Sequence, residues 1–115
     1  MARTVTIHDG NFEAEVLKSN KLVVLMFKME GCPYCRAMVP VMDQISEKFG
    51  DQIKIGMIDA TENEEIASEY KVQGVPHIFF FKNGQVIDEV SGAVSEDEMA
   101  KKVEAVLEST ASAKH

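Results

Sequence analysis

Two cysteines three positions apart are the residues of this chain with the clearest capacity for chemistry. They lie in the segment Cys32-Pro33-Tyr34-Cys35, and they are the only cysteines among the 115 residues. Two thiols at this spacing can alternate between a dithiol and a disulfide, and a thiolate formed there can attack a disulfide in another molecule. The pair therefore predicts thiol-disulfide exchange through a mixed-disulfide intermediate.

The surroundings of the pair predict which cysteine attacks. The apolar run Leu22–Phe27 predicts a buried central strand, and an apolar stripe of helical spacing follows from Cys32 to Phe49. Unpaired N–H groups and the helix dipole stabilise a thiolate at a helix start. Lowering a thiol pKa from about 8.5 to about 7 requires only about 2 kcal/mol and makes roughly half of the thiol ionised at pH 7. We therefore expect Cys32 to be the nucleophile and Cys35 to resolve the mixed disulfide.

Two other roles compete with redox chemistry for this pair. A structural disulfide across four residues would contribute only about 2 kcal/mol by the chain-entropy formula, against about 4.7 kcal/mol for a long loop. A metal site needs further ligands, and His8, His77 and His115 show no second paired spacing. Redox chemistry without a bound cofactor or metal is thus favoured, the Cys32–Cys35 disulfide itself being the redox group. A module that binds a metal or cluster with outside ligands, and inert thiols, remain as alternatives.

Strands and helices alternate along the chain around this pair. Capping-box signatures at Thr61-Glu62-Asn63-Glu64 and Ser95-Glu96-Asp97-Glu98 predict two helix starts, and Asn83-Gly84 predicts a two-residue hairpin turn. The order predicts an α/β fold with a mixed sheet covered by helices. The further strands expected are Thr4–Ile7, Ile53–Ile58, Ile78–Phe81 and Gln85–Val90, with a further helix within Asp9–Asn20.

Composition and charge narrow the class of protein and its partners. A chain of 115 residues with 45% apolar and 27% charged residues suits one domain, which we expect at residues 1–108, with a frayed tail at 109–115. Nineteen acidic against 12 basic residues give a charge of −7, which argues against nucleic acid and anionic membrane surfaces as partners. The sequence shows no apolar leader and no run long enough to span a bilayer. We therefore expect a cytoplasmic protein, acting as a monomer.

The chain resembles two related families in different segments. Its Cys-Pro-Tyr-Cys tetrapeptide resembles the active site of glutaredoxins, whereas nearly the whole chain resembles thioredoxins. The second resemblance rests on Gly74-Val75-Pro76, on Phe79-Phe80-Phe81-Lys82-Asn83-Gly84, and on Gly92 followed by a terminal helix. It implies a thioredoxin fold, in which a central mixed sheet has helices on both faces. It also implies a protein disulfide oxidoreductase that acts on client proteins and takes electrons from a thioredoxin reductase-type donor.

The resemblance also suggests residues that bind the substrate. The proline that matches Pro76 is cis in thioredoxins and lies against the dithiol, so Pro76 is expected beside Cys32. Val75 would then offer backbone hydrogen bonds to an extended client segment. We expect Gly31, Pro33 and Tyr34 to contact the client as well, although an exposed turn tip explains Tyr34 equally well. Pro40 matches a proline that kinks the family's long helix.

Several positions depart from the thioredoxin pattern. Gly31 and Lys28 stand where thioredoxins carry tryptophans, and Met26 and Met57 stand where they carry a buried aspartate and a lysine. We expect the two methionines to make the floor of the site apolar, so that deprotonation of Cys35 depends on solvent or on the departing thiolate.

Three further observations bear on the dithiol and its electron source. Lys28 is close enough in sequence to lower the pKa of Cys32, and His77 can tune the dithiol because imidazole titrates near neutrality. Orientation of His77 away from the site is the competing interpretation. The segment that holds glutathione in glutaredoxins has no match here, yet glutathione-dependent chemistry of the glutaredoxin type is kept as the alternative function.

Overall fold

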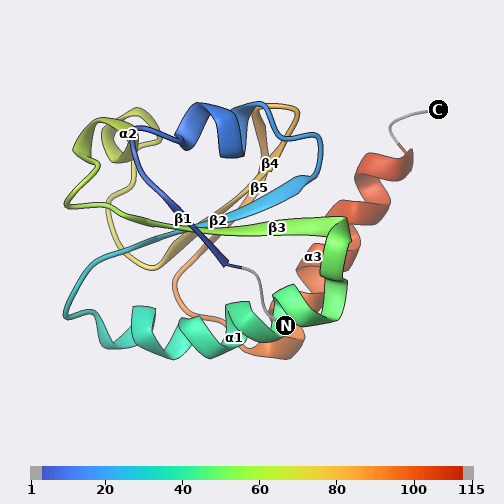
Figure 1. The fold of residues 1–115 in the computed structure, drawn as a ribbon. Helices are drawn as coiled ribbons and strands as arrows, with labels where there is room; N and C mark the ends of the chain where they lie inside the picture. Colours follow the sequence, from blue (N-terminus) through green and yellow to red (C-terminus); the bar gives the residue numbers. More distant parts are fainter. Residues whose placement is uncertain (1–3, 113–115) are drawn as a thin grey trace.

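The computed structural model of the chain describes residues 4–112, with side chains up to residue 109. Within that range, strands and helices alternate in the predicted order (Figure 1). The strands are β1 (Thr4–Ile7), β2 (Leu22–Lys28), β3 (Ile53–Asp59), β4 (His77–Lys82) and β5 (Gln85–Ser91). The helices are α1 (Pro33–Phe49), α2 (Glu64–Glu69) and α3 (Glu96–Ser112), with short helical segments η1 (Glu13–Leu17) and η2 (Gly50–Gln52).

The five strands form one mixed sheet in the order β1-β3-β2-β4-β5. Strand β3 pairs parallel with both β1 and β2, whereas β4 pairs antiparallel with β2 and β5. The prediction of a mixed sheet with β2 at its centre is therefore confirmed. The carboxyl ends of the parallel strands β2 and β3 lie at the same edge of the sheet, where α1 and α2 begin.

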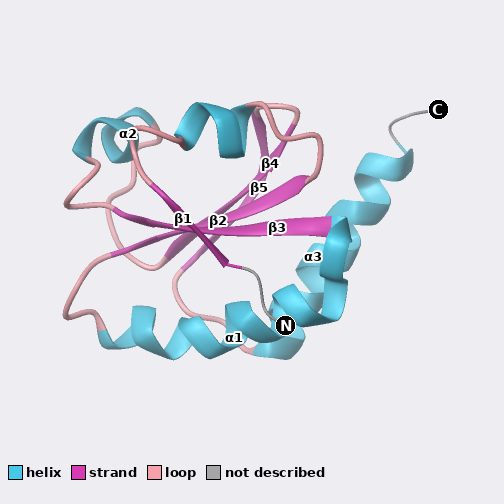
Figure 2. Ribbon diagram, viewed as in Figure 1, coloured by secondary structure: helices cyan, strands magenta, loops and turns pink. Residues whose placement is uncertain are grey.

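Helices cover both faces of the sheet, which explains why β2 is apolar from Leu22 to Phe27 (Figure 2). Leu22, Val24 and Met26 belong to the core beneath α1 and α3. Val23, Leu25 and Phe27 alternate with them and belong to the core that η1 and α2 cover. All six side chains are buried, since successive residues of a strand point to opposite faces.

Local signals in the second half of the chain fold as predicted. Asn83 and Gly84 both have positive φ, 53° and 80°, as a tight hairpin turn requires, and they join β4 to β5. The backbone N–H of Glu98 donates to Ser95 Oγ at 3.1 Å, and the Ser95 N–H donates to Glu98 Oε1 at 3.4 Å. The capping box at the start of α3 is therefore confirmed.

The predicted helix within Asp9–Asn20 forms as one wide helical turn, η1, and the side chain of Asn11 bonds the backbone of Thr6 and His8 just before it. The capping box at Thr61 is wrong, and α2 begins at Glu64 instead. Helix α3 continues to Ser112, within the segment 109–115 for which a frayed tail is predicted, while His115 lies outside the described residues.

The carboxylate of Asp59 explains the error at Thr61. It accepts the backbone N–H groups of Thr61 and Glu62 at 2.8 and 3.2 Å, and it also accepts the Thr61 hydroxyl. Thr61 is therefore held in a turn at the end of β3 and is not available to cap the helix that follows.

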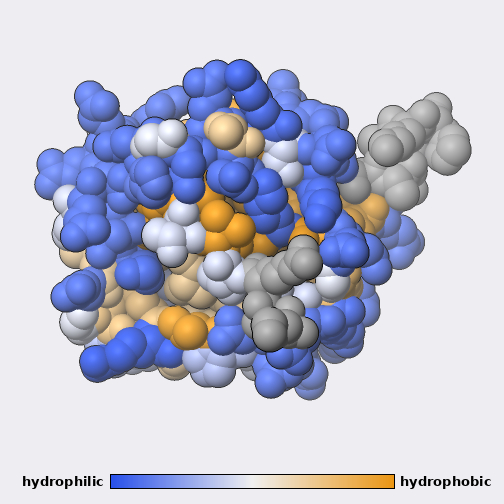
Figure 3. Space-filling view, viewed as in Figure 1, coloured by the Kyte–Doolittle hydropathy of each residue, from blue (hydrophilic) through white to orange (hydrophobic). Residues whose placement is uncertain are grey.

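The surface agrees with the acidic, charged composition. Hydrophilic residues cover most of the face seen in Figure 3, and hydrophobic residues show in its middle, where the β1 edge of the sheet lies. None of the helices in residues 4–112 has the length and apolar character that crossing a membrane requires.

Candidate redox site

The two cysteines lie at the junction of the β2–α1 loop and the first turn of α1, at the lower left in Figure 1. Cys32 is the N-cap residue of α1 and has an extended backbone conformation, with φ −92° and ψ 108°. Its Sγ forms a disulfide with Sγ of Cys35, and the two Cα atoms are 5.2 Å apart. Pro33 occupies the first helical position, where the absence of an N–H costs no hydrogen bond.

The helix start treats the two sulfurs differently. The backbone N–H of Cys35 donates to Cys32 Sγ at 3.1 Å, whereas no such donor to Cys35 Sγ is found among the described residues. Cys32 is partly exposed, but Cys35 is only 3% exposed. An amide that donates to a sulfur favours its anionic form, and exposure allows that sulfur to meet another molecule. Only Cys32 combines both properties.

A loop far along the chain lies beside Cys32. The Val75–Pro76 peptide bond is cis, as the resemblance implied, and the carbonyl oxygen of Val75 is 3.9 Å from Cys32 Sγ. The N–H of Gly92 donates to the carbonyl oxygen of Pro76 at 2.9 Å and ties the loop after β5 to this segment. The structure therefore brings Val75 and Pro76 to the dithiol, with Gly92 behind them.

The remaining residues predicted to bind the client also surround the cysteines. Gly31 has a φ of 78°, a left-handed conformation that other residues rarely adopt, and a Cβ added there would meet no atom within 4 Å. Tyr34 is 68% exposed at the tip of the loop, and Pro33 beside it is also exposed. These three residues thus form an open outer surface around the more exposed sulfur.

The floor of the site is apolar. Met26 and Met57 are register partners on β2 and β3, and they are 0% and 8% exposed. Both belong to the core beneath α1 and α3. Thioether side chains cannot accept a proton at neutral pH, so neither methionine can serve as a base for Cys35.

A cavity of about 340 Å³ opens beside Cys35. Cys35 lines it and Cys32 does not. Its other lining residues come from the end of β2, from the β2–α1 loop, from α1 and from β3, and they are Lys28, Met29, Glu30, Gly31, Arg36, Val39 and Met57. The predicted influence of Lys28 on Cys32 is thus not supported by this cavity, because Lys28 shares it with the other cysteine.

Lys28 has a charged partner that sequence reasoning missed. Its Nζ is 3.9 Å from Oδ2 of Asp59, the residue opposite it in the β2–β3 register. The Thr61 hydroxyl lowers the pKa of Asp59, and the backbone N–H groups of Thr61 and Glu62 and the charge of Lys28 lower it further, against the effect of burial. The pairing was detectable in principle, because Lys28 and Asp59 end neighbouring parallel strands.

The structure does not bring the His77 imidazole to the dithiol. Its Nε2 is 2.7 Å from Oε1 of Glu89 on β5, and its ring stacks on Phe79 at a centroid distance of 4.5 Å. Phe79 belongs to the core on the face opposite α1. The His77 side chain therefore lies with Phe79 and Glu89, although the residue directly follows Pro76 in the chain.

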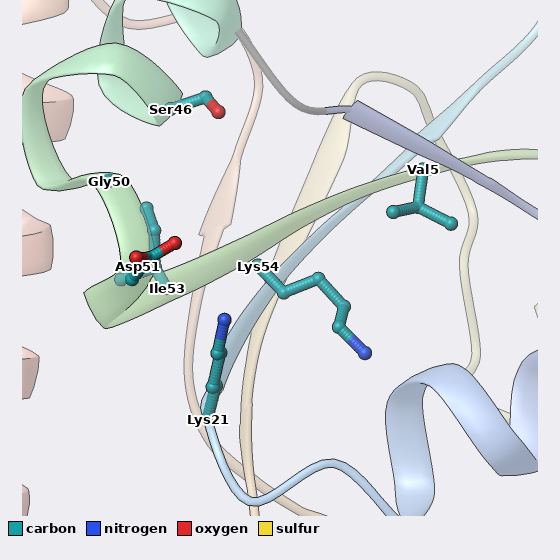
Figure 4. Close-up of a pocket in the computed structure, with 7 residues that line it drawn as sticks. All are labelled: Val5, Lys21, Ser46, Gly50, Asp51, Ile53 and Lys54. Atoms are coloured by element: carbon teal, nitrogen blue, oxygen red, sulfur yellow. The ribbon is translucent and has the colours of Figure 1, made fainter. Parts of the chain in front are cut away.

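A second cavity, of about 250 Å³, lies at the other end of the sheet and contains no redox-active group (Figure 4). Lys54, one of its lining residues, extends away from Asp51, and its ammonium donates to the carbonyl and carboxylate oxygens of Glu15 at 3.0 Å. Within residues 4–112, no three His, Cys, Asp or Glu side chains gather in a group that could hold a metal ion.

Comparison with known proteins agrees with this site. A sequence model of the Thioredoxin family matches residues 3–105. The chain is 35% identical over 100 residues to Thioredoxin 1 of Synechococcus elongatus, covering 87% of this chain and 94% of that protein. It is 34% identical over 107 residues to a thioredoxin of Synechocystis sp., covering 93% of this chain and 100% of that protein. A thioredoxin of Acetoanaerobium sticklandii is 36% identical over 96 residues, which cover 84% of this chain and 89% of that protein. These matches do not favour the glutaredoxin alternative.

Proposed function

The chain belongs to the thioredoxin family and is a protein disulfide oxidoreductase with a thioredoxin fold, and we propose that Cys32 is its nucleophile and Cys35 its resolving thiol. The observation that carries this assignment is the 3.1 Å hydrogen bond from the Cys35 N–H to Cys32 Sγ. Partial exposure of Cys32 and burial of Cys35 support the same order of attack. The redox group is the protein's own dithiol, so the reaction needs no bound cofactor.

The proposed reaction has two displacements. The Cys32 thiolate attacks one sulfur of a client disulfide, forming a mixed disulfide and releasing the other client sulfur as a thiolate. The Cys35 thiol then loses its proton and attacks Cys32 Sγ, and the bond between Cys32 and the client breaks. The client leaves with two reduced sulfurs, while the Cys32–Cys35 disulfide holds the oxidised state until a reductase returns two electrons.

We propose that the client lies across the exposed surface around Cys32. The Val75 carbonyl, 3.9 Å from the sulfur, supports a role in hydrogen bonding to an extended client segment, with Pro76 packed beside the dithiol. Gly31, Pro33 and Tyr34 would contact the client from the other side. The exposed ring of Tyr34 would be covered on binding, which gives this part of the proposal a direct spectroscopic test.

Family membership implies disulfide-containing substrates and a reductase-type partner. Our finer proposal is that clients are proteins, that the donor is a thioredoxin reductase-type enzyme, and that the protein acts as a cytoplasmic monomer with its domain at residues 1–108. A reducing compartment is required for the dithiol to be regenerated by such a donor. Sedimentation of the purified chain and fractionation of cells test the monomer and the location.

Trapping experiments test the order of attack. Cys35→Ser should accumulate mixed disulfides with client proteins on Cys32, because the resolving step is removed. Cys32→Ser, which leaves only the buried thiol, is the matched control and should trap little. Equal trapping by the two variants, or trapping by Cys32→Ser alone, would show that the roles are assigned wrongly.

A further inference from the structure

The apolar floor of the site disfavours the resolving step, because that step requires a charged sulfur at Cys35. Cys35 must lose its proton to attack Cys32 Sγ, yet it is only 3% exposed and has Met26 and Met57 in the core beneath α1. Burial without a countercharge disfavours a thiolate. Some group must therefore offset that cost at the face of Cys35 that opens to the 340 Å³ cavity.

Lys28 is held where it can act across this cavity. It ends β2 opposite Asp59, and its carbonyl oxygen accepts the N–H of Ala60 at 2.9 Å, which fixes its backbone. Its ammonium pairs with Asp59 Oδ2 at 3.9 Å, and the Asp59 carboxylate is itself held by Thr61 and Glu62. The ion pair thus places the cation at the cavity that Cys35 also lines.

The other charged groups around Cys35 are less well placed. Glu30 and Arg36 line the same cavity, from the loop and from α1, but both are exposed and their opposite charges are screened by water. Met57, which lines the cavity from β3, is uncharged. Asp59, also on β3, is the ion-pair partner of Lys28. Lys28 is partly buried, so its charge is screened less than that of either neighbour.

We propose that Lys28 is a positioning residue for the second displacement, in which its ammonium stabilises the Cys35 thiolate across the cavity. The inference rests on the proposed role of Cys35 as the resolving thiol. The proton of Cys35 passes to water in the cavity, the new bond joins Cys35 Sγ to Cys32 Sγ, and the electron pair of the broken bond leaves on the client sulfur. Lys28 neither gives nor takes a proton in this step.

Titration of Cys35 in a Cys32→Ser background tests the electrostatic claim directly, using thiolate absorbance against pH. Lys28→Met should raise the pKa of the Cys35 thiol, and Asp59→Asn should lower it, because the second change leaves the cation without its partner. Lys28→Arg keeps the charge and should stay near the parent, as should Lys48→Met, which removes a lysine from the far end of α1. A purely structural role for Lys28 predicts no opposite shifts, and equal or parallel shifts would overturn the proposal.

Single-turnover kinetics in the two-cysteine protein test the same claim during the reaction. For each unit by which the Cys35 pKa rises, the thiolate fraction falls tenfold, while greater nucleophilicity offsets about threefold of that loss. Lys28→Met should therefore slow resolution about three- to fourfold per unit and leave the attack by Cys32 unchanged. If Cys32 forms no mixed disulfide in any variant, the proposed function itself is wrong. If mixed disulfides form normally and resolve at one rate in all variants, only the role of Lys28 is refuted.

Discussion

Replacing Met26 with aspartate tests whether the apolar floor limits the resolving step. Met26 is 0% exposed and lies opposite Met57 in the β2–β3 register, in the core that α1 covers. A carboxylate there would stand beneath the first turns of α1 and could accept the Cys35 proton. Positioned general bases typically contribute 10²–10⁴-fold to a rate. We expect resolution of a mixed disulfide to become at least roughly tenfold faster than in a Met26→Leu control at a pH where the introduced carboxyl is ionised.

The cost in stability follows from burial of the new carboxyl. Desolvation raises the pKa of such a group by up to about 3–5 units, which corresponds to about 4–7 kcal/mol. The pKa in the folded state lies above that in the unfolded state, so the loss is absent below the unfolded value near 4. It grows as the pH rises through the folded value. Urea unfolding of Met26→Asp and Met26→Leu across pH 4–8 should therefore diverge with increasing pH.

Stopped-flow measurement of resolution across pH 5–9 decides the mechanistic question. Met26→Asp should add an inflection at the pH where the introduced carboxyl ionises, whereas Met26→Leu should follow the thiol alone. If the aspartate variant is too unstable at neutral pH, Met57→Asp offers a second test, because Met57 lines the cavity and solvent can reach it. Identical rate profiles for the aspartate and control variants would refute the idea that the floor lacks a needed base.

Three predictions concern the scaffold. Ser95→Ala removes the cap of α3 and should cost about 1 kcal/mol in urea unfolding, whereas Ser95→Asp should restore most of it. Gly84→Ala should cost at least about 1 kcal/mol, because φ is 80° and the new Cβ would lie 3.0 Å from the Leu17 carbonyl oxygen. Burial would raise the pKa of Asp88, but hydrogen bonds from Lys102 and from the backbone lower it overall. This carboxylate therefore stabilises the fold above pH about 4, and its contribution disappears as the pH falls through the lowered pKa. Asp88→Asn should cost about 0.5 kcal/mol at pH 7 and less at pH 2.

The order of helices and strands could be predicted because the local sequence preferences agree with the packing of the folded protein. The run Leu22–Phe27 is apolar at every position since both faces of β2 are covered, and Asn83-Gly84 satisfies a turn that needs two positive φ values. The error at Thr61 arose because the carboxylate of Asp59, two residues earlier, bonds Thr61 and holds it in a turn. Such a side-chain bond is local, but neither helical periodicity nor the capping-box pattern encodes it.

The predictions about the candidate site were likewise correct where one segment of the chain decided them. The place of both cysteines at a helix start followed from one segment of chain, so the sequence was sufficient to predict it. The neighbours of Cys32 and Cys35 come from distant segments, and only the thioredoxin resemblance indicated Pro76 beforehand. The pairing of Lys28 with Asp59 was detectable from the ends of two neighbouring strands and was missed, whereas nothing in the sequence indicated that Cys35 lines the same cavity as Lys28. His77 was ambiguous because a strand residue beside the site can point to either face.

The two cysteines lie in different environments, so each thiolate is stabilised by a different group. Cys32 is partly exposed and receives an N–H at 3.1 Å from the first turn of α1, so the helix start itself favours its thiolate. Cys35 is buried, and among the described residues no backbone N–H donates to its sulfur. It lines a cavity that Lys28 also lines. If amide donation alone activated the pair, changing Lys28 would affect neither step. If changing Lys28 slows the second displacement and not the first, each cysteine has its own source of positive charge. If it slows neither, the helix start alone activates both cysteines.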